Sequence, residues 1–352
     1  MRSLNNRAIV AAAGSRKTQH IIDQVLGDPM KRVLVTTYTN ENLSQIVNRL
    51  SDGTGILPSN VTVMGWFTFL MNQCARPYQS YVLGETGLMG GLNFLGQRSR
   101  FTRKDKPKQY YLDTAGAVYR NEVAALAHEA NERSGGRVVD RLTGMYDHIY
   151  VDEIQDMAGY DLDLLDALMK SPIGLTMVGD PRQATFATNT AARNRRYRGS
   201  AIVDWFNERT DVCVIDSRVE SYRCNQAICD FADDLYPKLP RTISKNTELT
   251  GHDGIFDIRG ADVPEYVAQY SPAVLRWDRR TRTGDLEAMN MGASKGSTYD
   301  RVLIFPTKPM ITYYKIRDFN VLKEHAKFYV AVTRARYSVT FVLPYTGLVN
   351  QI

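Results

Sequence analysis

Long apolar runs are missing from this chain of 352 residues. No stretch of about 18 or more apolar residues occurs, which is the length that a membrane-spanning helix needs. The first segment, MRSLNNRAIVAAAGSRKT, carries an apolar run that is too short for a secretory signal and that gives way to polar and basic residues. We therefore expect a cytoplasmic protein with no membrane partner.

Cysteine and histidine are scarce and scattered. The four cysteines, Cys74, Cys213, Cys224 and Cys229, show no C-x-x-C spacing, and the five histidines do not gather into a metal-ligand pattern. This distribution argues against a disulfide framework and against a zinc site, because both need suitably spaced ligands. We interpret the cysteines as reduced residues that are either part of the core or incidental.

The composition that is present fits a large folded protein. Hydrophobic residues make up 43% of the chain, which is enough for a large core and, at this length, for two domains. The formal net charge of +6 favours a polyanionic partner such as nucleic acid. A basic surface that only meets solvent explains the charge equally well, so both interpretations stay open.

Apolar, β-branched runs recur along the chain and predict buried strands. They are Val33–Thr37, Val61–Met64, His148–Val151, Leu175–Val178, Val212–Ile215, Val302–Phe305 and Val339–Leu343. Polar or helical stretches separate them, and this alternation is typical of an α/β fold with largely parallel sheets. Residues 76–146 break the alternation, because they are rich in Gly, Arg, Lys and Tyr before they turn helical. We expect them to form an inserted, mainly helical subdomain.

Residues 11–18, AAAGSRKT, follow a short apolar run and precede a helical stretch with apolar residues on one face. The phosphate-binding pattern is G-x-x-x-x-G-K-[ST]; here Ala11 and Arg16 hold the two glycine positions, while Lys17 and Thr18 remain. In such a loop, backbone N–H groups bind phosphate, the lysine reaches the terminal phosphates and the hydroxyl helps to hold Mg²⁺. Taken alone, the segment also fits a plain loop and helix start, which is the commoner case.

Two later segments place acidic and polar residues directly after predicted strands. In YDHIYVDEIQD, Asp152 would hold Mg²⁺ and Glu153 would activate a water as general base, unless the pair only caps a helix. In LTMVGDPRQATF, Gln183 would sense the terminal phosphate of a nucleotide, unless Asp-Pro-Arg is merely a turn. Both alternatives stay open at the level of the single motif.

Eight segments in a fixed order resemble the motifs of superfamily 1 helicases of the UvrD/Rep type, and the match runs through nearly all of the chain. They are AAAGSRKT (11–18), TTYTNENLSQIVNRL (36–50), TVMGWFTFL (62–70), VDEIQD (151–156), GDPRQATF (179–186), SYRCNQAI (221–228), GASKGSTYDRVLIF (292–305) and FYVAVTRAR (328–336). Each segment is weak alone, but their shared order makes coincidence a poor explanation.

The resemblance implies an α/β protein of two tandem RecA-like domains, with ATP and Mg²⁺ bound in the cleft between them. The implied first domain covers 1–75 and 147–215, the inserted accessory subdomain 76–146, and the second domain 216–352, with only a vestigial insertion at about 229–291. Relatives carry a large insertion in that last range. We therefore expect duplex unwinding to be weak without a partner, while ATP hydrolysis stimulated by single strands persists.

The resemblance also implies the roles of individual residues. Implied catalytic residues are Lys17, Asp152, Glu153 and Gln183 in the first domain and Arg223 and Arg334, as arginine fingers, in the second. Implied nucleotide-binding residues are Ala13, Gly14, Ser15, Arg16, Lys17, Thr18 and Gly296, and implied metal ligands are Thr18 and Asp152. Implied nucleic-acid-binding residues are Tyr38, Thr39, Asn40, Trp66, Phe186, Ser294 and Lys295.

Two features leave the resemblance open to interpretation. Arg16 stands where relatives have a glycine, and if this position needs a positive φ, a side chain costs about 1–2 kcal/mol there; an added guanidinium could instead help to bind phosphate. The clusters RSRFTRKDKPKQYY (98–111) and ARNRRYRGS (192–200) interleave basic and aromatic residues, as a groove for DNA would. They fit a solvated face equally well.

The function implied by the resemblance is ATP-dependent translocation on single-stranded DNA, 3′ to 5′, with unwinding of duplexes at single/double-strand junctions. A bacterial or phage-encoded protein with a nuclease or a replication or repair protein as partner is expected. The alternative is a weakly catalytic or non-catalytic nucleic-acid-binding subunit of a repair or phage-defence nuclease complex. An unrelated P-loop kinase or GTPase leaves residues 221–228, 292–305 and 328–336 unexplained.

Overall fold

Two separate hydrophobic cores divide the chain, in the computed structural model, into two units. The structure describes residues 5–344, so the ends of the predicted ranges 1–75 and 216–352 lie outside the described residues. The first unit holds residues 5–10, 17–181 and 186–217, and the second unit holds residues 11–16, 182–185 and 218–344. Two short segments, 11–16 and 182–185, therefore pack with the second unit although their neighbours in sequence belong to the first.

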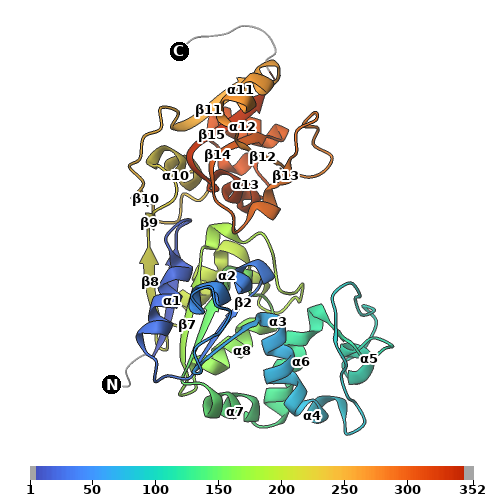
Figure 1. Ribbon diagram of the computed structural model, residues 1–352. Coiled ribbons are helices and arrows are strands. Elements are labelled where there is room, and N and C mark those ends of the chain that lie inside the picture. The colour runs from blue at the N-terminus through green and yellow to red at the C-terminus, as the bar shows by residue number, and fades with distance from the viewer. Residues whose placement is uncertain (1–4, 345–352) are drawn as a thin grey trace. The chain divides into compact units, whose positions relative to one another are not determined.

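The first unit is built on a six-stranded sheet (Figure 1). Its strands are, in spatial order, β3 (Val61–Gly65), β2 (Val33–Thr37), β6 (His148–Asp152), β7 (Gly174–Gly179), β1 (Asn6–Ala11) and β8 (Val214–Arg218). The pairs β3–β2, β2–β6, β6–β7 and β7–β1 are all parallel. β2 and β7 are buried along their whole length, as their apolar sequences predict.

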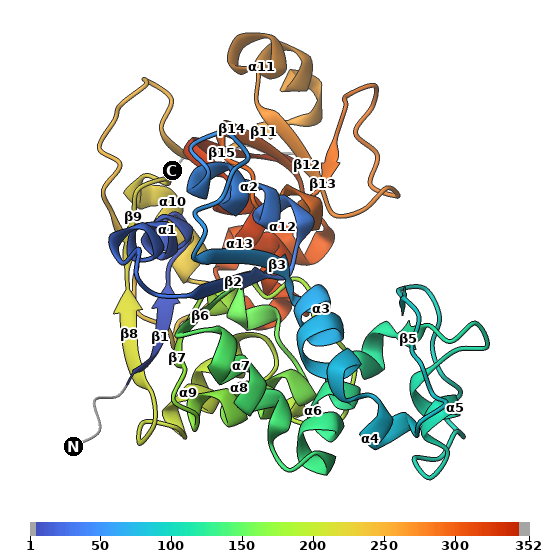
Figure 2. The same cartoon turned by 60° about the horizontal axis from the view of Figure 1, so that its bottom comes forward.

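Helices cover both faces of this sheet, as Figure 2 shows. α1 (Lys17–Gly27) and α2 (Asn40–Leu50) lie on one face, and α8 (Tyr160–Met169) and α9 (Ile202–Asn207) lie on the other. This is what right-handed crossovers require, since the chain runs outward from β1 to β3 on one side and from β6 to β8 on the other. Thr39 caps α2 by accepting a hydrogen bond from the backbone N–H of Asn42 at 3.2 Å.

The range 76–146 contains mostly short elements and two longer helices. They are a 3₁₀ turn (Arg76–Tyr78), α4 (Ser80–Leu83), β4 (Leu92–Asn93), α5 (Pro107–Tyr111), β5 (Val118–Tyr119), a 3₁₀ turn (Arg120–Glu122), α6 (Val123–Arg133) and α7 (Arg137–Met145). α6 is buried on most of its surface and packs against α8 and against the π-helix Phe69–Ala75, which continues α3 (Trp66–Thr68). β4 and β5 pair with each other and not with the main sheet.

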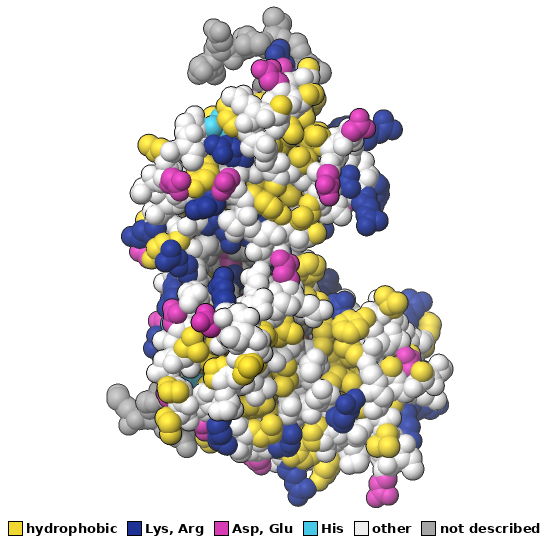
Figure 3. All heavy atoms as spheres, viewed as in Figure 1, with side chains coloured by type: hydrophobic (Ala, Val, Ile, Leu, Met, Phe, Trp, Pro, Cys, Tyr) yellow, Lys and Arg dark blue, Asp and Glu magenta, His cyan; other side chains and the backbone are white. Residues whose placement is uncertain are grey.

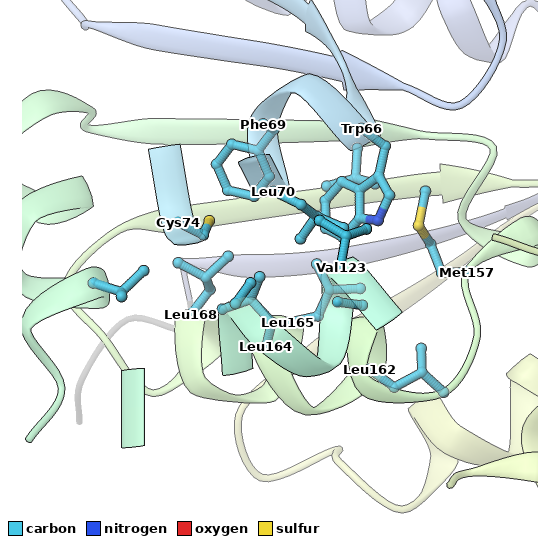
Figure 4. Packing of buried hydrophobic residues seen from close by; sticks show 14 of the residues in the cluster. Trp66, Phe69, Leu70, Cys74, Val123, Met157, Leu162, Leu164, Leu165 and Leu168 are labelled. Carbon is cyan, nitrogen blue, oxygen red and sulfur yellow. The ribbon is translucent and has the colours of Figure 1, made fainter. Parts of the chain in front are cut away.

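The core between the sheet and these helices is drawn in Figure 4. Trp66, Phe69, Leu70 and Cys74 pack here against leucines of α8 and Val123 of α6. The indole N–H of Trp66 donates a hydrogen bond of 2.8 Å to Oδ1 of Asp161 on α8. Asp161 is itself fully buried and also accepts hydrogen bonds from Thr188 and Asn189, so the core contains one polar network that is shared by three segments.

The second unit is built on a five-stranded sheet in which every pair is parallel. Its strands are, in spatial order, β11 (Gly254–Arg259), β15 (Ala335–Leu343), β14 (Tyr299–Phe305), β12 (Ala273–Arg276) and β13 (Met289–Asn290). The seven predicted strands are present in the two sheets, and the α/β class with parallel sheets is confirmed. β11 and β12 were not predicted; they lie within 229–291 and pair with β15 and β14 in this sheet.

Within 218–344, four α-helices, three 3₁₀ helices (Gly260–Asp262, Met291–Ser294 and Phe319–Val321) and a small strand pair accompany this sheet. The helices are α10 (Gln226–Asp233), α11 (Val263–Tyr270), α12 (Lys308–Ile316) and α13 (His325–Val332), and the pair is β9 (Glu220–Ser221) with β10 (Ile243–Ser244). Asn225 caps α10 by accepting from the backbone N–H of Ile228 at 3.1 Å.

The expectations for cysteines and membrane helices can be compared with residues 5–344. All four cysteines are free and buried there. None of the helices in this range combines the length and the apolar composition that crossing a bilayer demands.

Candidate active site

Four predicted site residues meet at the carboxyl edge of the first sheet. Lys17 and Thr18 begin α1, Asp152 ends β6 and Glu153 follows it, and β6 lies two strands away from β1 in the sheet. The Thr18 hydroxyl lies 3.1 Å from Oδ2 of Asp152, and Nζ of Lys17 lies 3.4 Å from Oε1 of Glu153. This edge, where strand connections leave in opposite directions, is where parallel sheets bind ligands.

Glu153 is held more firmly than the other three residues. Its φ of +59° is left-handed, which is rare for a residue with a side chain. Oε1 accepts a hydrogen bond from the Asn42 amide at 3.2 Å, and Oε2 accepts one from Gln155. The other end of the Gln155 amide accepts from the backbone N–H of Asp180 at 3.1 Å. Gln155 therefore ties the end of β6 to the end of β7 through the Glu153 carboxylate.

A glycine makes this arrangement possible. A Cβ atom on Gly179 would lie 2.2 Å from Oε1 of Gln155 and 2.8 Å from a methyl group of Ile154. Gln155 and Asn42 were not among the predicted site residues. Gln155 could have been found, because it is the glutamine of the D-E-x-Q-D pattern, whereas no spacing in the sequence links Asn42 to Glu153.

Burial makes the Asp152 carboxyl a weaker acid. Asp152 is fully buried, and this burial raises the pKa of its carboxyl from 3.8 to about 6; the neighbouring Glu153 carboxylate adds to the rise, while Lys17 opposes it. A cation in addition to Lys17 near the Asp152 carboxylate would therefore stabilise its ionised form.

The residues present fit a magnesium ion that is shared with phosphate. Mg²⁺ binds oxygen ligands, usually one or two carboxylates together with phosphates and waters. The Thr18 hydroxyl and the Asp152 carboxylate supply two such oxygens. Within residues 5–344 no three His, Cys, Asp or Glu side chains gather as an all-protein metal site requires, so the remaining ligands would come from substrate and water.

The loop that precedes Lys17 packs in the second unit. The backbone N–H of Ala12 donates to the carbonyl of Arg218 at 2.8 Å, and the N–H of Tyr222 donates to the carbonyl of Gly14 at 3.0 Å. Gly14 has a φ of +74°, and a Cβ there would lie 2.7 Å from Cβ of Arg223. Only glycine fits this position.

Arg16 occupies the unusual position of the loop. Its φ is +60°, so the position does require the left-handed conformation that a glycine adopts without cost. Its guanidinium lies 4.0 Å from the centre of the Tyr222 ring. Next to it, the Ser15 hydroxyl is buried without a hydrogen-bond partner among the described residues. An orphaned buried hydroxyl in an anion-binding type of loop fits a phosphate oxygen as partner.

The remaining predicted catalytic residues lie in the second unit. Arg334 is 1% exposed and donates to the carbonyl of Val330 at 3.0 Å and to the side-chain oxygen of Gln183 at 3.1 Å. Arg223 is half-buried and donates to the carbonyl of Thr333 at 3.1 Å. Gln183 and Arg334 are thus in direct contact, and Arg223 reaches the residue next to Arg334.

The predicted nucleic-acid residues divide by accessibility. In the first unit, Phe186 is 44% exposed, Tyr38 is half-buried and Asn40 is exposed. Thr39 is half-buried, and its hydroxyl is engaged in the cap of α2. Tyr38 and Phe186 lie beside each other with ring centres 6.1 Å apart.

Three other predicted nucleic-acid residues are buried. Trp66 is 1% exposed and lies in the core of Figure 4, so its ring offers no face to a base. Ser294 is fully buried, and its hydroxyl donates to the carbonyl of Met291 at 2.7 Å. Lys295 is 7% exposed, and the following Gly296 has a φ of +95°. The sequence pattern alone could not separate these buried positions from exposed ones.

The basic clusters are largely engaged within the protein. In 192–200, Arg193 pairs with Asp163 at 2.7 Å and Arg196 pairs with Glu208 at 3.0 Å. In 98–111, Arg98 pairs with Glu122 at 2.7 Å, Arg103 with Asp105 at 2.9 Å and Lys104 with Glu129 at 3.4 Å, while Arg100, Lys106 and Lys108 are exposed. These contacts favour a solvated face for 192–200 and leave the outer part of 98–111 available.

Comparison with known proteins gives one family and several related folds. Residues 101–195 match the family model of the UvrD/REP helicase N-terminal domain. No curated protein matches the chain. Arterivirus nonstructural protein 10, a helicase, is similar in structure with 15% identity and a TM-score of 0.51, over 96% of this chain and 60% of that one.

Two further solved structures are similar at the same identity of 15%. One is a complex of arterivirus nonstructural protein 10 (helicase) with DNA, with a TM-score of 0.49 over 96% of this chain and 61% of that chain. The other is the PRRSV helicase, with a TM-score of 0.46 over 97% of this chain and 53% of that chain. The chain thus spans between about half and three-fifths of the length of these proteins.

The likeness in structure concerns the fold. Two parallel sheets, each with its own helices, are consistent with two tandem RecA-like domains. The match to the UvrD/REP helicase N-terminal domain covers a segment of the first unit that includes Asp152 and Glu153, and it also includes Gln183. The resemblance to UvrD/Rep-type helicases is therefore confirmed, through the UvrD/REP helicase N-terminal domain match over residues 101–195.

Proposed function

We propose that this chain is an ATP-dependent translocase on single-stranded DNA, with helicase activity at single/double-strand junctions. The observation that carries the proposal is the meeting of Lys17, Thr18, Asp152 and Glu153 at one sheet edge. A threonine beside a buried aspartate, and a lysine beside a second carboxylate, are the groups that ATP hydrolysis uses in P-loop proteins.

Thr18 and Asp152 would hold Mg²⁺, and Lys17 would bind the terminal phosphates of ATP. When bound, the ion would neutralise charge on the phosphates. Lys17 would then exchange its contact with Glu153 for one with phosphate. This exchange would take the lysine away from Oε1 of Glu153, to which the Asn42 amide still donates, and loss of the nearby cation would raise the proton affinity of the carboxylate.

Glu153 would act as the general base that takes a proton from the attacking water. Gln155 and Asn42 would be positioning residues, since each donates to the Glu153 carboxylate. The left-handed backbone of Glu153 supports a functional role, because such strain persists where the surrounding structure fixes it.

Gln183 and Arg334 would act as a pair in the second unit. The Arg334 guanidinium donates to the Gln183 amide oxygen at 3.1 Å. We propose that the Gln183 amide contacts the terminal phosphate of ATP when the nucleotide is bound. We propose that Arg334 and Arg223 stabilise charge on the transferring phosphoryl group, as arginine fingers do. We also propose that five further residues bind the nucleotide: Ala13, Gly14, Ser15, Arg16 and Gly296. The proposed domains have the limits that the sequence predicts.

The direct test is release of phosphate from ATP with and without single-stranded DNA. We expect DNA to stimulate the wild type and Lys17→Ala to remove both basal and stimulated turnover. Lys170→Ala is the matched control, because this lysine is exposed and, among the described residues, pairs with the nearby Asp166. Turnover by Lys17→Ala at the wild-type rate would refute the nucleotide site. DNA binding without stimulation would favour the non-catalytic binding subunit.

The direction of movement needs a separate test. We propose movement from 3′ to 5′, in line with the resemblance to the UvrD/Rep type. Displacement of streptavidin from one biotinylated end of an oligonucleotide distinguishes the two directions. Faster displacement from the 5′ end supports the proposal, and faster displacement from the 3′ end overturns the polarity while leaving the ATPase intact.

A further inference from the structure

Four aromatic rings form a continuous row in the first unit. Phe186 contacts Tyr38 at 6.1 Å between ring centres, Tyr38 contacts Phe67 at 5.8 Å, and Phe67 contacts Phe94 at 5.6 Å. These rings, called the aromatic row below, come from four separate segments, and Phe94 lies in the range 76–146. Only the first two were predicted to bind nucleic acid.

Both ends of the aromatic row are open to solvent. Phe94 is 57% exposed and Phe186 is 44% exposed, while Tyr38 and Phe67 are half-buried between them. Hydrophobic side chains also gather on the face of this unit that Figure 3 shows, over α3 and toward 76–146. A contiguous surface of large apolar side chains is uncommon on a monomer and marks a surface that binds a partner.

Arg120 fixes the aromatic row and adds charge to it. Its guanidinium lies 5.8 Å from the centre of the Phe67 ring and donates to the carbonyls of Ala187 at 2.8 Å and Thr188 at 3.3 Å. The backbone just after Phe186 is thereby tied to the middle of the row. Carbonyl groups leave the positive charge of Arg120 uncompensated, and no carboxylate pairs with it among the described residues.

The segment that follows Phe94 is strongly basic. Residues 98–108 hold six Lys or Arg and one Asp. Three of them form ion pairs: Arg98 with Glu122, Arg103 with Asp105 and Lys104 with Glu129. The other three, Arg100, Lys106 and Lys108, are exposed and form no ion pair among the described residues. Aromatic rings followed by exposed cations suit a partner that offers flat bases and negative phosphates at once, because bases stack on aromatic side chains whatever their sequence. An apolar protein partner would use the rings but would gain little from the neighbouring positive charge.

We propose that the aromatic row is one stacking surface for single-stranded nucleic acid, in which Phe67 and Phe94 extend the path from Phe186 and Tyr38 onto the range 76–146. The inference rests on the proposed function and names where the strand runs beyond the residues already predicted. Phe94 is the terminal binding residue, Phe67 lies under the path, and Arg120 is a positioning residue that holds the row together.

The test compares affinities for a fluorescent oligothymidylate by anisotropy. Phe94→Ala should weaken binding about five- to hundredfold, as the loss of one stacked base does. Phe94→Trp should restore it, since tryptophan keeps a flat face. Phe101→Ala is the control, because Phe101 is 78% exposed in the same segment but contacts no ring of the row among the described residues.

The outcomes separate this inference from the proposed function. Suppose that DNA stimulates ATP hydrolysis by the wild type and that Tyr38→Ala weakens binding of the oligothymidylate. If Phe94→Ala then binds the oligothymidylate like wild type, the extension onto 76–146 is refuted and the proposed function stands. Equal losses in Phe94→Ala and Phe101→Ala would also overturn it, because the segment would then act through general contacts. If wild type binds no oligonucleotide, both the inference and the nucleic-acid part of the function fail.

Discussion

Replacement of Arg16 tests the most unusual residue of the phosphate loop. Its backbone is left-handed, with a φ of +60°, and its guanidinium stacks 4.0 Å from the centre of the Tyr222 ring. Arg16→Gly removes the strain and the stacking together. Arg16→Ala removes only the stacking, because alanine keeps the Cβ that makes the conformation costly. The two variants therefore separate the backbone effect from the side-chain effect.

The magnitudes follow from these two contributions. A left-handed residue with a Cβ costs about 1–2 kcal/mol, glycine costs about 0.5–1 kcal/mol more in chain entropy, and an exposed cation–π contact contributes about 0.5–1 kcal/mol. Arg16→Ala should lower the free energy of unfolding by about 0.5–1 kcal/mol. Arg16→Gly should leave the free energy of unfolding nearly unchanged, so the glycine variant should be more stable than the alanine variant by about 1 kcal/mol.

Urea unfolding of the three proteins measures this order. A double-mutant cycle with Tyr222→Leu should return a coupling of about 0.5–1 kcal/mol to Arg16. Nucleotide affinity is then measured on the same proteins; because arginine already adopts the glycine conformation, Arg16→Gly should bind ATP within about tenfold of wild type, less than about 1.4 kcal/mol. Lower stability for glycine than for alanine would refute the reasoning.

Three further predictions concern the core and the sheet edge. Trp66→Phe removes the indole donor to the buried Asp161 carboxyl, so we expect about 1–3 kcal/mol less stability in urea with unchanged affinity for DNA; weakened DNA binding by a folded variant would contradict the buried role. Burial raises the pKa of Asp161 from 3.8 to about 6, so its contribution to stability is greatest below about pH 4 and is lost as pH rises through 6. Urea unfolding at several pH values should therefore show that the difference in stability between wild type and Asp161→Asn moves in favour of the variant as pH rises. A difference that does not change with pH would argue against the raised pKa of Asp161. Gly179→Ala places a Cβ 2.2 Å from Gln155, so stability should fall by about 1–3 kcal/mol and turnover should fall with it; wild-type turnover would show that the Gln155 contact is dispensable.

The sheets could be predicted because parallel strands bury both faces. Segments such as VLVTT at Val33–Thr37 are rich in apolar and β-branched residues, and the structure has β2 with the same limits. β11 was missed because GIFDIR contains Gly, Asp and Arg and is only partly buried, and β12 was missed because AVLR has only four residues. The strands are recognisable only once the sheet that pairs them is known.

The site was predictable where chemistry fixes both residue type and spacing. Asp152 and Glu153 are adjacent in sequence, and Lys17 and Thr18 follow a strand, so their meeting at one sheet edge follows from parallel topology. Burial was not predictable from the pattern. Trp66 looked like a stacking residue, yet it lies in the core because its indole satisfies a buried carboxylate. Phe94 gave no sequence signal, since its place in the aromatic row depends on a contact between distant segments.

The sequence alone did not predict that the backbone of Arg16 is left-handed. The sequence showed that arginine replaces a glycine, but not whether the backbone keeps the glycine conformation. The structure shows that it does, and that Tyr222 is the partner of the side chain.

The central claim is that Glu153 activates water for DNA-stimulated ATP hydrolysis. Glu153→Gln keeps the shape of the side chain and removes the base, so ATP and DNA binding should persist while stimulated phosphate release falls about a hundredfold or more. Glu132→Gln, at an exposed glutamate of α6, is the control and should match wild type. Phosphate release by Glu153→Gln at the wild-type rate, with DNA present, would contradict the account.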